Sequence, residues 1–123
     1  MAKILIVDDD HELVALLTEI LKRDGHAVRS ASEPVEGMQK CRAETPDLII
    51  LDFHMPGTDG AHLFESLRRN QASRETPILF LSGEAAPEQI LDKITDTSHS
   101  QFLAKPIHVD QLRHTVREML EHG

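Results

Sequence analysis

Short apolar runs alternate along the chain with longer segments in which apolar residues recur at helical spacing. Three runs, residues 4–7, 48–51 and 78–81, are fully apolar, which is typical of strands buried on both faces. Residues 27–31 alternate apolar and polar side chains and predict a half-exposed edge strand. Residues 102–104 predict a short last strand. The pattern therefore indicates five strands, three of them central.

Helices are predicted between and after these strands. Leucine and isoleucine recur every three or four residues after the first strand, and Gly25 is expected to end that helix. Pro34 and Pro87 each stand where a helix can begin, because proline suits the first turn. Residues 55–60 are expected to form a loop by composition. The helical patterns cover residues 13–21, 34–42, 63–67, 87–94 and 109–120.

Five strand–helix units in strict alternation predict a parallel sheet with helices on both faces. We find no internal repeat, low-complexity stretch or linker in the sequence. The expectation is one doubly wound α/β domain that fills residues 1–123. In such sheets, functional residues lie beyond the carboxyl ends of the strands.

Polar side chains follow four of the five strands at those ends. They are Asp8, Asp9 and Asp10 after the first strand, Asp52 after the third, Ser82 after the fourth and Lys105 after the last. One of these acids, Asp10, is also expected to be the N-cap of the first helix. The predicted topology brings the whole set to one edge of the sheet.

These residue types suit phosphoryl chemistry. Crowded carboxylates repel one another, and a hard divalent cation such as Mg²⁺ relieves that repulsion. Asp52 is a candidate nucleophile, because a carboxylate can form an acyl phosphate. Lys105 and Ser82 would stabilise charge on the phosphoryl oxygens.

Composition excludes several other functions. The chain of 123 residues has 13 Lys and Arg against 21 Asp and Glu, a net charge of −8, which argues against direct binding of nucleic acid through its phosphates. A single cysteine, Cys41, excludes an internal disulfide and a multi-cysteine zinc site. No apolar run approaches the length of a membrane span. The amino-terminal residues lack a secretory signal pattern, so the cytoplasm is the expected compartment.

Four segments of the sequence resemble the receiver domain of two-component response regulators. The segments are residues 4–10, 51–60, 81–85 and 103–106, and the resemblance runs from Lys3 to about Leu120. It implies the flavodoxin-like fold, with strand order 2-1-3-4-5. It further implies a signalling switch that catalyses its own phosphorylation and dephosphorylation but does not turn over an external substrate.

The resemblance also implies the chemistry of the acidic edge. Asp52 would accept a phosphoryl group from a histidine kinase or a histidine phosphotransfer protein. Asp9, Asp52 and the backbone carbonyl of His54 would bind Mg²⁺, with Mn²⁺ as a possible substitute, and Asp8 would act mostly through a metal-bound water. The phosphoryl group would contact Ser82, Lys105 and the backbone of Gly83.

Further roles follow from the same resemblance. Ser82 and Phe102 would form the switch, and the peptide bond between Lys105 and Pro106 would be cis. Two residues, His54 and Glu84, would tune hydrolysis of the phosphoryl group. The face formed by the fourth helix, the last strand and the last helix would then signal to an effector.

The sequence departs from the family pattern at three places. Phe102 lacks the hydroxyl of the tyrosine that many relatives carry, so its switch would work by packing alone. Residues 97–99 (Thr-Ser-His) stand where relatives usually have a Gly-Ala pair, and Thr58 replaces an apolar residue. These changes affect the shape of the signalling face more than the chemistry.

Three alternative functions compete with a phosphoacceptor switch. A flavodoxin-type electron carrier is disfavoured, because three adjacent acids would repel a flavin phosphate. An aspartyl phosphatase usually needs a second acid where this chain has His54, and a cap for which 123 residues leave no room. A pseudo-receiver, a binding module that works without phosphorylation, stays open. The expected partners are a histidine kinase or a histidine phosphotransfer protein and a downstream effector, and the expected state is a monomer or a phosphorylation-dependent dimer.

Overall fold

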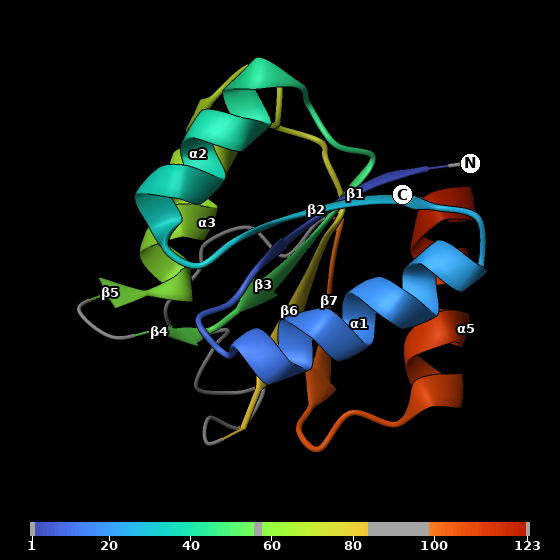
Figure 1. Cartoon of the computed structure of the whole chain (residues 1–123). Coiled ribbons are helices and arrows are strands. Elements are labelled where there is room, and N and C mark those ends of the chain that lie inside the picture. Colours follow the sequence, from blue (N-terminus) through green and yellow to red (C-terminus); the bar gives the residue numbers. More distant parts are fainter. Residues whose placement is uncertain (1, 56–57, 84–98, 123) are drawn as a thin grey trace.

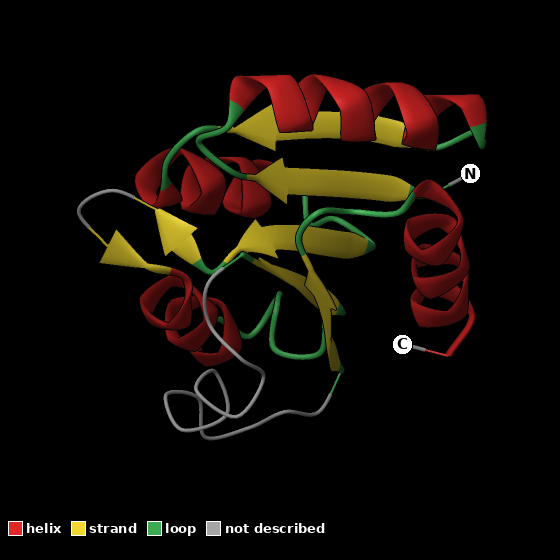
Figure 2. Cartoon of the chain, turned by 90° about the horizontal axis from the view of Figure 1, so that it is seen from below, coloured by secondary structure: helices red, strands yellow, loops and turns green. Residues whose placement is uncertain are grey.

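The computed structural model describes residues 2–55, 58–83 and 99–122. Five parallel strands form its central sheet, in the order β2-β1-β3-β6-β7. Counted without a short separate hairpin, this order is 2-1-3-4-5, as predicted. Figure 2 shows the strands running in the same direction. Their bounds are Lys3–Val7 (β1), Ala27–Ala31 (β2), Leu48–Asp52 (β3), Ile78–Ser82 (β6) and Ser100–Ala104 (β7).

Four described helices cover the two faces of the sheet. They are α1 (His11–Arg23), α2 (Pro34–Ala43), α3 (Gly60–Arg69) and α5 (Val109–His122). Helices α1 and α5 lie on one face, and α2 and α3 lie on the other (Figure 1). The predicted doubly wound architecture is therefore confirmed for the described part of the chain. The helix expected over 87–94 lies outside the described residues.

Alternate residues of each strand supply two separate cores, because successive side chains of a strand point to opposite faces. In β1, Ile4 and Ile6 pack with α1 and α5, whereas Leu5 and Val7 pack with α2 and α3. Strand β3 is divided in the same way. Because both faces are covered, its residues from Leu48 to Leu51 have no exposed surface. A sequence run that is apolar at every position is the consequence.

The first helix begins and ends as its sequence predicts. The Asp10 side chain accepts hydrogen bonds from the backbone N–H groups of Glu12 and Leu13, both at 3.1 Å. Beyond its end, Gly25 has a φ of 91°, a backbone conformation that favours glycine. These two ends fix where the chain leaves β1 and enters β2.

Part of the predicted loop 55–60 belongs to regular secondary structure. Two short strands, β4 (His54–Met55) and β5 (Thr58–Asp59), pair antiparallel, and α3 begins at residue 60. The pairing comes from the backbone and has no apolar periodicity, so the sequence pattern indicated only a loop. None of the described helices has the length and apolar character needed to cross a lipid bilayer.

Candidate functional site

The predicted site residues meet at the carboxyl ends of the strands. Asp8 and Asp9 directly follow β1, Asp52 ends β3, Ser82 ends β6, and Lys105 directly follows β7. The parallel register aligns these ends, since Asp52 pairs with Leu81 and Ser82 with Ala104. The acids, the hydroxyl and the ammonium group therefore lie at one edge of the sheet, as the sequence predicts.

Three carboxylates form the centre of this edge. One carboxylate oxygen each from Asp8, Asp9 and Asp52 lies within 4.8 Å of the others. Asp8 and Asp52 are buried, with exposed fractions of 1% and 4%. The Oδ1 atom of Asp8 accepts a hydrogen bond from the backbone N–H of Asp10 at 2.9 Å. Its Oδ2 atom is buried and accepts no hydrogen bond from any described residue. Such a set of oxygen atoms fits a hard divalent cation.

Lys105 supplies the positive charge that faces these acids. Its Nζ lies 3.4 Å from Asp52 Oδ1 and 3.6 Å from Asp8 Oδ2. The backbone N–H of Lys105 donates to the carbonyl of Ser82 at 2.8 Å, which holds the ends of β6 and β7 together. The side chain of Lys105 also passes close to Gly83, where a Cβ would lie 3.6 Å from Lys105 Cδ. The Lys105–Pro106 peptide bond is cis, as the resemblance implies.

The electrostatics of the site disfavour three ionised acids without a cation. The pKa of Asp8 is raised to about 6, mainly by burial and also by the neighbouring charges of Asp52 and Asp9. The hydrogen bond from the Asp10 backbone and the charge of Lys105 lower that pKa only in part. One ammonium does not balance three carboxylates, so a bound divalent cation would relieve the excess negative charge.

Phe102 belongs to an aromatic cluster that the sequence analysis did not identify. Its half-buried ring stacks on Phe80, with centroids 5.3 Å apart and planes inclined by 14°. Phe80 also contacts Phe53 at 6.0 Å and Phe64 at 5.4 Å. The four phenylalanines are all the aromatic Phe, Tyr and Trp side chains of the chain. They connect the predicted switch residue to Phe53, the neighbour of Asp52.

Two predicted residues lie partly or wholly outside the described residues. The backbone of His54 is in β4, where it pairs with Asp59, but its side chain is not described. Glu84 is outside the described ranges, as are Thr97 and Ser98. The tuning roles of His54 and Glu84, and the metal contact of the His54 carbonyl, therefore stay predictions.

Known proteins resemble the chain in both sequence and structure. The DNA-binding dual master transcriptional regulator RpaA of Synechocystis is 34% identical over 122 residues, which are 98% of this chain and 49% of RpaA. Protein PilH of Pseudomonas aeruginosa is 30% identical over 122 residues, 98% of each protein. The chemotaxis protein CheY4 of Vibrio cholerae has a TM-score of 0.86 at 29% identity, covering 97% of this chain and 98% of CheY4.

Length separates these relatives into two kinds. The chain spans about half the length of several curated relatives, RpaA among them, and nearly the whole of PilH. The sequence profile of the response regulator receiver domain matches residues 4–117. With that match over most of its length, and with the acids, hydroxyl and lysine gathered at one edge of the sheet, the chain belongs to the response regulator receiver domain family.

Proposed function

We propose that Asp52 accepts a phosphoryl group from the phosphohistidine of a histidine kinase or a histidine phosphotransfer protein. A carboxylate oxygen of Asp52 forms a bond to phosphorus while the phosphorus–nitrogen bond of the donor breaks. The electron pair of that bond stays on the imidazole of the donor. The observation that carries the proposal is the position of the Asp52 carboxylate, 3.4 Å from the Lys105 ammonium and beside two further acids.

Asp8, Asp9 and Asp52 fit a magnesium ion, with the backbone carbonyl of His54 as a further ligand. The buried Asp8 Oδ2 atom, which accepts no hydrogen bond within the described part of the chain, supports this assignment, and Asp8 would act mostly through a metal-bound water. Mn²⁺ has similar ligand preferences and would substitute. When bound, the cation supplies positive charge that offsets the charge of the phosphoryl oxygens.

Lys105 contacts the site residues in both the unmodified and the phosphorylated protein. In the unmodified protein its ammonium pairs with Asp52 and Asp8. After transfer, the same ammonium contacts a phosphoryl oxygen, together with the Ser82 hydroxyl and the backbone N–H of Gly83. An ammonium 4 Å from a unit negative charge contributes about 4 kcal/mol at an effective dielectric constant near 20, before desolvation is subtracted.

A change at Ser82 and Lys105 is expected to alter the packing of Phe102. The hydrogen bond from Lys105 N to the Ser82 carbonyl links the ends of β6 and β7, and Phe102 packs in β7 against Phe80 of β6. A contact between Ser82 and the phosphoryl group would therefore change the packing of Phe102. A shift from mostly off to mostly on needs about 5 kcal/mol of differential stabilisation, and an effector would recognise the changed surface. In this proposal the protein acts as a cytoplasmic signalling switch rather than a turnover enzyme.

Intact-mass spectrometry tests the phosphorylation directly. The protein is incubated with acetyl phosphate, in Mg²⁺ or in EDTA, beside Asp52→Asn and Asp47→Asn. Asp47 is a matched control, because it is an exposed aspartate just before the other end of β3. We expect a mass gain of one phosphoryl group in the wild type and Asp47→Asn, and none in Asp52→Asn or without Mg²⁺. Failure of the wild type to gain mass under any condition would leave a phosphorylation-independent binding module.

The lifetime of the phosphorylated form is assigned to His54 and Glu84. The assignment rests on their positions two residues beyond Asp52 and Ser82. His54→Ala and Glu84→Ala should change the rate at which the phosphoryl mass decays after the donor is removed. Unchanged decay in both variants would contradict the assignment without affecting the role of Asp52.

A further inference from the structure

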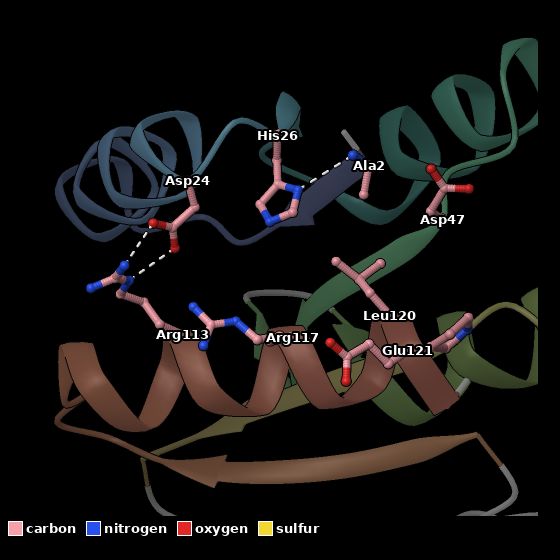
Figure 3. A pocket seen from close by; sticks show the side chains of 9 residues that line it. Ala2, Asp24, His26, Asp47, Arg113, Arg117, Leu120 and Glu121 are labelled. Atoms are coloured by element: carbon pink, nitrogen blue, oxygen red, sulfur yellow. Dashed lines mark hydrogen bonds and ion pairs between the residues drawn. The ribbon is translucent and has the colours of Figure 1, made fainter.

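A second polar pocket lies at the opposite end of the sheet from Asp52. It has a volume of about 660 Å³ and is lined by residues just before strands β1, β2, β3 and β6, by Asp24 beyond α1, and by one side of α5 (Figure 3). None of the proposed phosphorylation residues lines it. Its chemistry therefore needs an account of its own.

Asp24 and Arg113 form a fixed part of the wall. Nε and Nη2 of Arg113 each donate to a different oxygen of Asp24, both at 2.9 Å. These hydrogen bonds hold the pKa of Asp24 below its usual range, so the carboxylate stays charged at neutral pH. Because the two charges satisfy each other, this pair shapes the pocket without adding net charge.

Arg117 and His26 offer hydrogen-bond donors to the pocket. Arg117 lies one turn after Arg113 on α5, is exposed, and makes no hydrogen bond or ion pair within the described residues. His26 Nδ1 accepts a hydrogen bond from the Ala2 backbone N–H at 3.4 Å. Burial lowers the pKa of His26, and a neutral ring with Nδ1 as acceptor carries its proton on Nε2. Figure 3 shows both side chains facing the space between the start of β2 and α5.

An acidic side chain, Asp47, and an apolar one, Leu120, line the pocket away from the Arg117 guanidinium. The carboxylate of Asp47 lies away from the two guanidinium groups, and Leu120 stands between Arg117 and Asp47 in Figure 3. Asp47 Oδ2 accepts the backbone N–H of Lys3 at 2.8 Å, which holds the carboxylate in place. Glu121 adds a further carboxylate to the lining, and Figure 3 places it on α5 between Arg117 and Leu120. Asp47 supplies a carboxylate on the side of the pocket away from Arg117.

We propose that this pocket binds a small zwitterion of the amino-acid or short-peptide class. The ligand carboxylate would pair with the Arg117 guanidinium, whose planar donors match a carboxylate, and with His26 Nε2–H. The ligand ammonium would face Asp47, and an apolar side chain would lie against Leu120. A simple anion would be repelled by Asp47 and Glu121, in a chain of net charge −8. A simple cation would be repelled by Arg117. A zwitterion avoids both repulsions.

The test is a titration of the ¹⁵N-labelled protein with the dipeptide glycyl-leucine, followed by NMR. Saturable shifts are expected at backbone amides around His26, Asp47 and Leu120. Glycyl-leucinamide lacks the carboxylate and N-acetyl-glycyl-leucine lacks the ammonium, so each should bind about tenfold more weakly. Arg117→Gln should weaken the binding of glycyl-leucine by a similar factor. Arg42→Gln, a change at an exposed arginine of α2 outside the pocket lining, should have no effect.

Three results would overturn the proposal. The first is the absence of saturable shifts at this end of the sheet up to tens of millimolar dipeptide. The second is equal binding by Arg117→Gln and wild type. The third is equal binding of the acetylated and free dipeptides, which would make the pocket a plain anion site. The spectrum of unliganded Arg117→Gln shows whether that variant is folded.

Discussion

His99, the residue before β7, has a backbone conformation that is unfavourable for its side chain. Its φ is 59°, in the left-handed region that costs non-glycine residues roughly 1–2 kcal/mol. Its carbonyl accepts hydrogen bonds from the Ile78 backbone N–H at 2.9 Å and from Arg68 Nη2 at 3.4 Å. These contacts fix the start of β7 beside β6 and hold His99 in this conformation.

Replacement of His99 by glycine is expected to stabilise the fold. His99→Gly removes the steric cost of a positive φ, and the greater freedom of glycine in the unfolded chain offsets part of the gain. The expected net increase in unfolding free energy is about 0.5–1 kcal/mol, measured by urea denaturation. His99→Ala keeps a Cβ and should give no increase. Equal stabilisation by both substitutions would assign the effect to loss of the imidazole instead of to φ.

The sequence indicated this position only in part. Residues 97–99 depart from the Gly-Ala pair that is usual in the family, which is consistent with a backbone suited to glycine. The sign of φ depends on the hydrogen bonds of the His99 carbonyl to Ile78 and Arg68. Such contacts between distant segments have no signature in the sequence.

At the scale of elements, the start of α1 joins a structural role to the candidate site. Asp10 caps the helix, while its own backbone N–H donates to Asp8 Oδ1. The cap therefore fixes the path of the chain that carries Asp8 and Asp9. Of the three adjacent acids, Asp10 caps the helix, and Asp8 and Asp9 belong to the acidic centre.

Removal of the cap should destabilise the protein moderately. Asp10→Ala loses the acceptor for the N–H groups of Glu12 and Leu13, and N-cap losses of this kind cost about 1 kcal/mol. Asp10→Asn keeps an oxygen acceptor and should retain most of the stability. Urea unfolding of the two variants makes the comparison. An equal loss in both would mean that the charge of Asp10, rather than its hydrogen bonds, stabilises α1.

The elements that could be predicted are those whose burial leaves a pattern in the sequence. β1, β3 and β6 are covered on both faces, so their apolar runs located them to within one residue at either end. The hairpin of β4 and β5 escaped prediction, because its pairing involves backbone atoms of residues that otherwise indicate a loop. The acidic site was predictable because its residues stand at the ends of the apolar runs that locate the strands.

The second pocket was not predictable by that reasoning. Asp24 and Arg113 are separated by 89 residues and belong to no motif. In the sequence, Asp24 and Arg113 each have the pattern of an ordinary solvent-exposed charge. Only the packing of α5 beside the end of α1 brings them together, and the sequence pattern does not specify that packing at the level of side chains.

At the scale of the molecule, its two poles contrast in charge balance. At the amino ends of the strands, Asp24 and Arg113 neutralise each other in a bidentate ion pair. At the carboxyl ends, three carboxylates face one ammonium, and two of the acids are buried. A fold selected only for stability would not retain that excess. The candidate site at the carboxyl ends is therefore expected to destabilise the protein when no cation is bound.

Asp8 allows this cost to be measured. Its pKa of about 6 in the folded protein is above the value of about 3.9 for an unfolded chain. The folded state therefore binds more protons between those values, and stability falls as the pH rises from about 4 to about 6. Asp8→Asn keeps Oδ1 as the acceptor for Asp10 and removes the charge. In EDTA at pH 7, the variant should be more stable by on the order of 2 kcal/mol, and the gain should vanish near pH 4.

Magnesium should act in the opposite direction on the same pair of proteins. Added Mg²⁺ stabilises a folded state that binds it, so the wild type should gain more from the cation than Asp8→Asn, and the difference between them at pH 7 should shrink. Asp47→Asn, at the other pole, should follow the wild type in both buffers. If Asp8→Asn were less stable than wild type in EDTA at pH 7, the pairing of Asp8 with Lys105 would outweigh the cost of its burial. The acidic centre would then be a source of stability, and a need for charge relief would no longer support cation binding there.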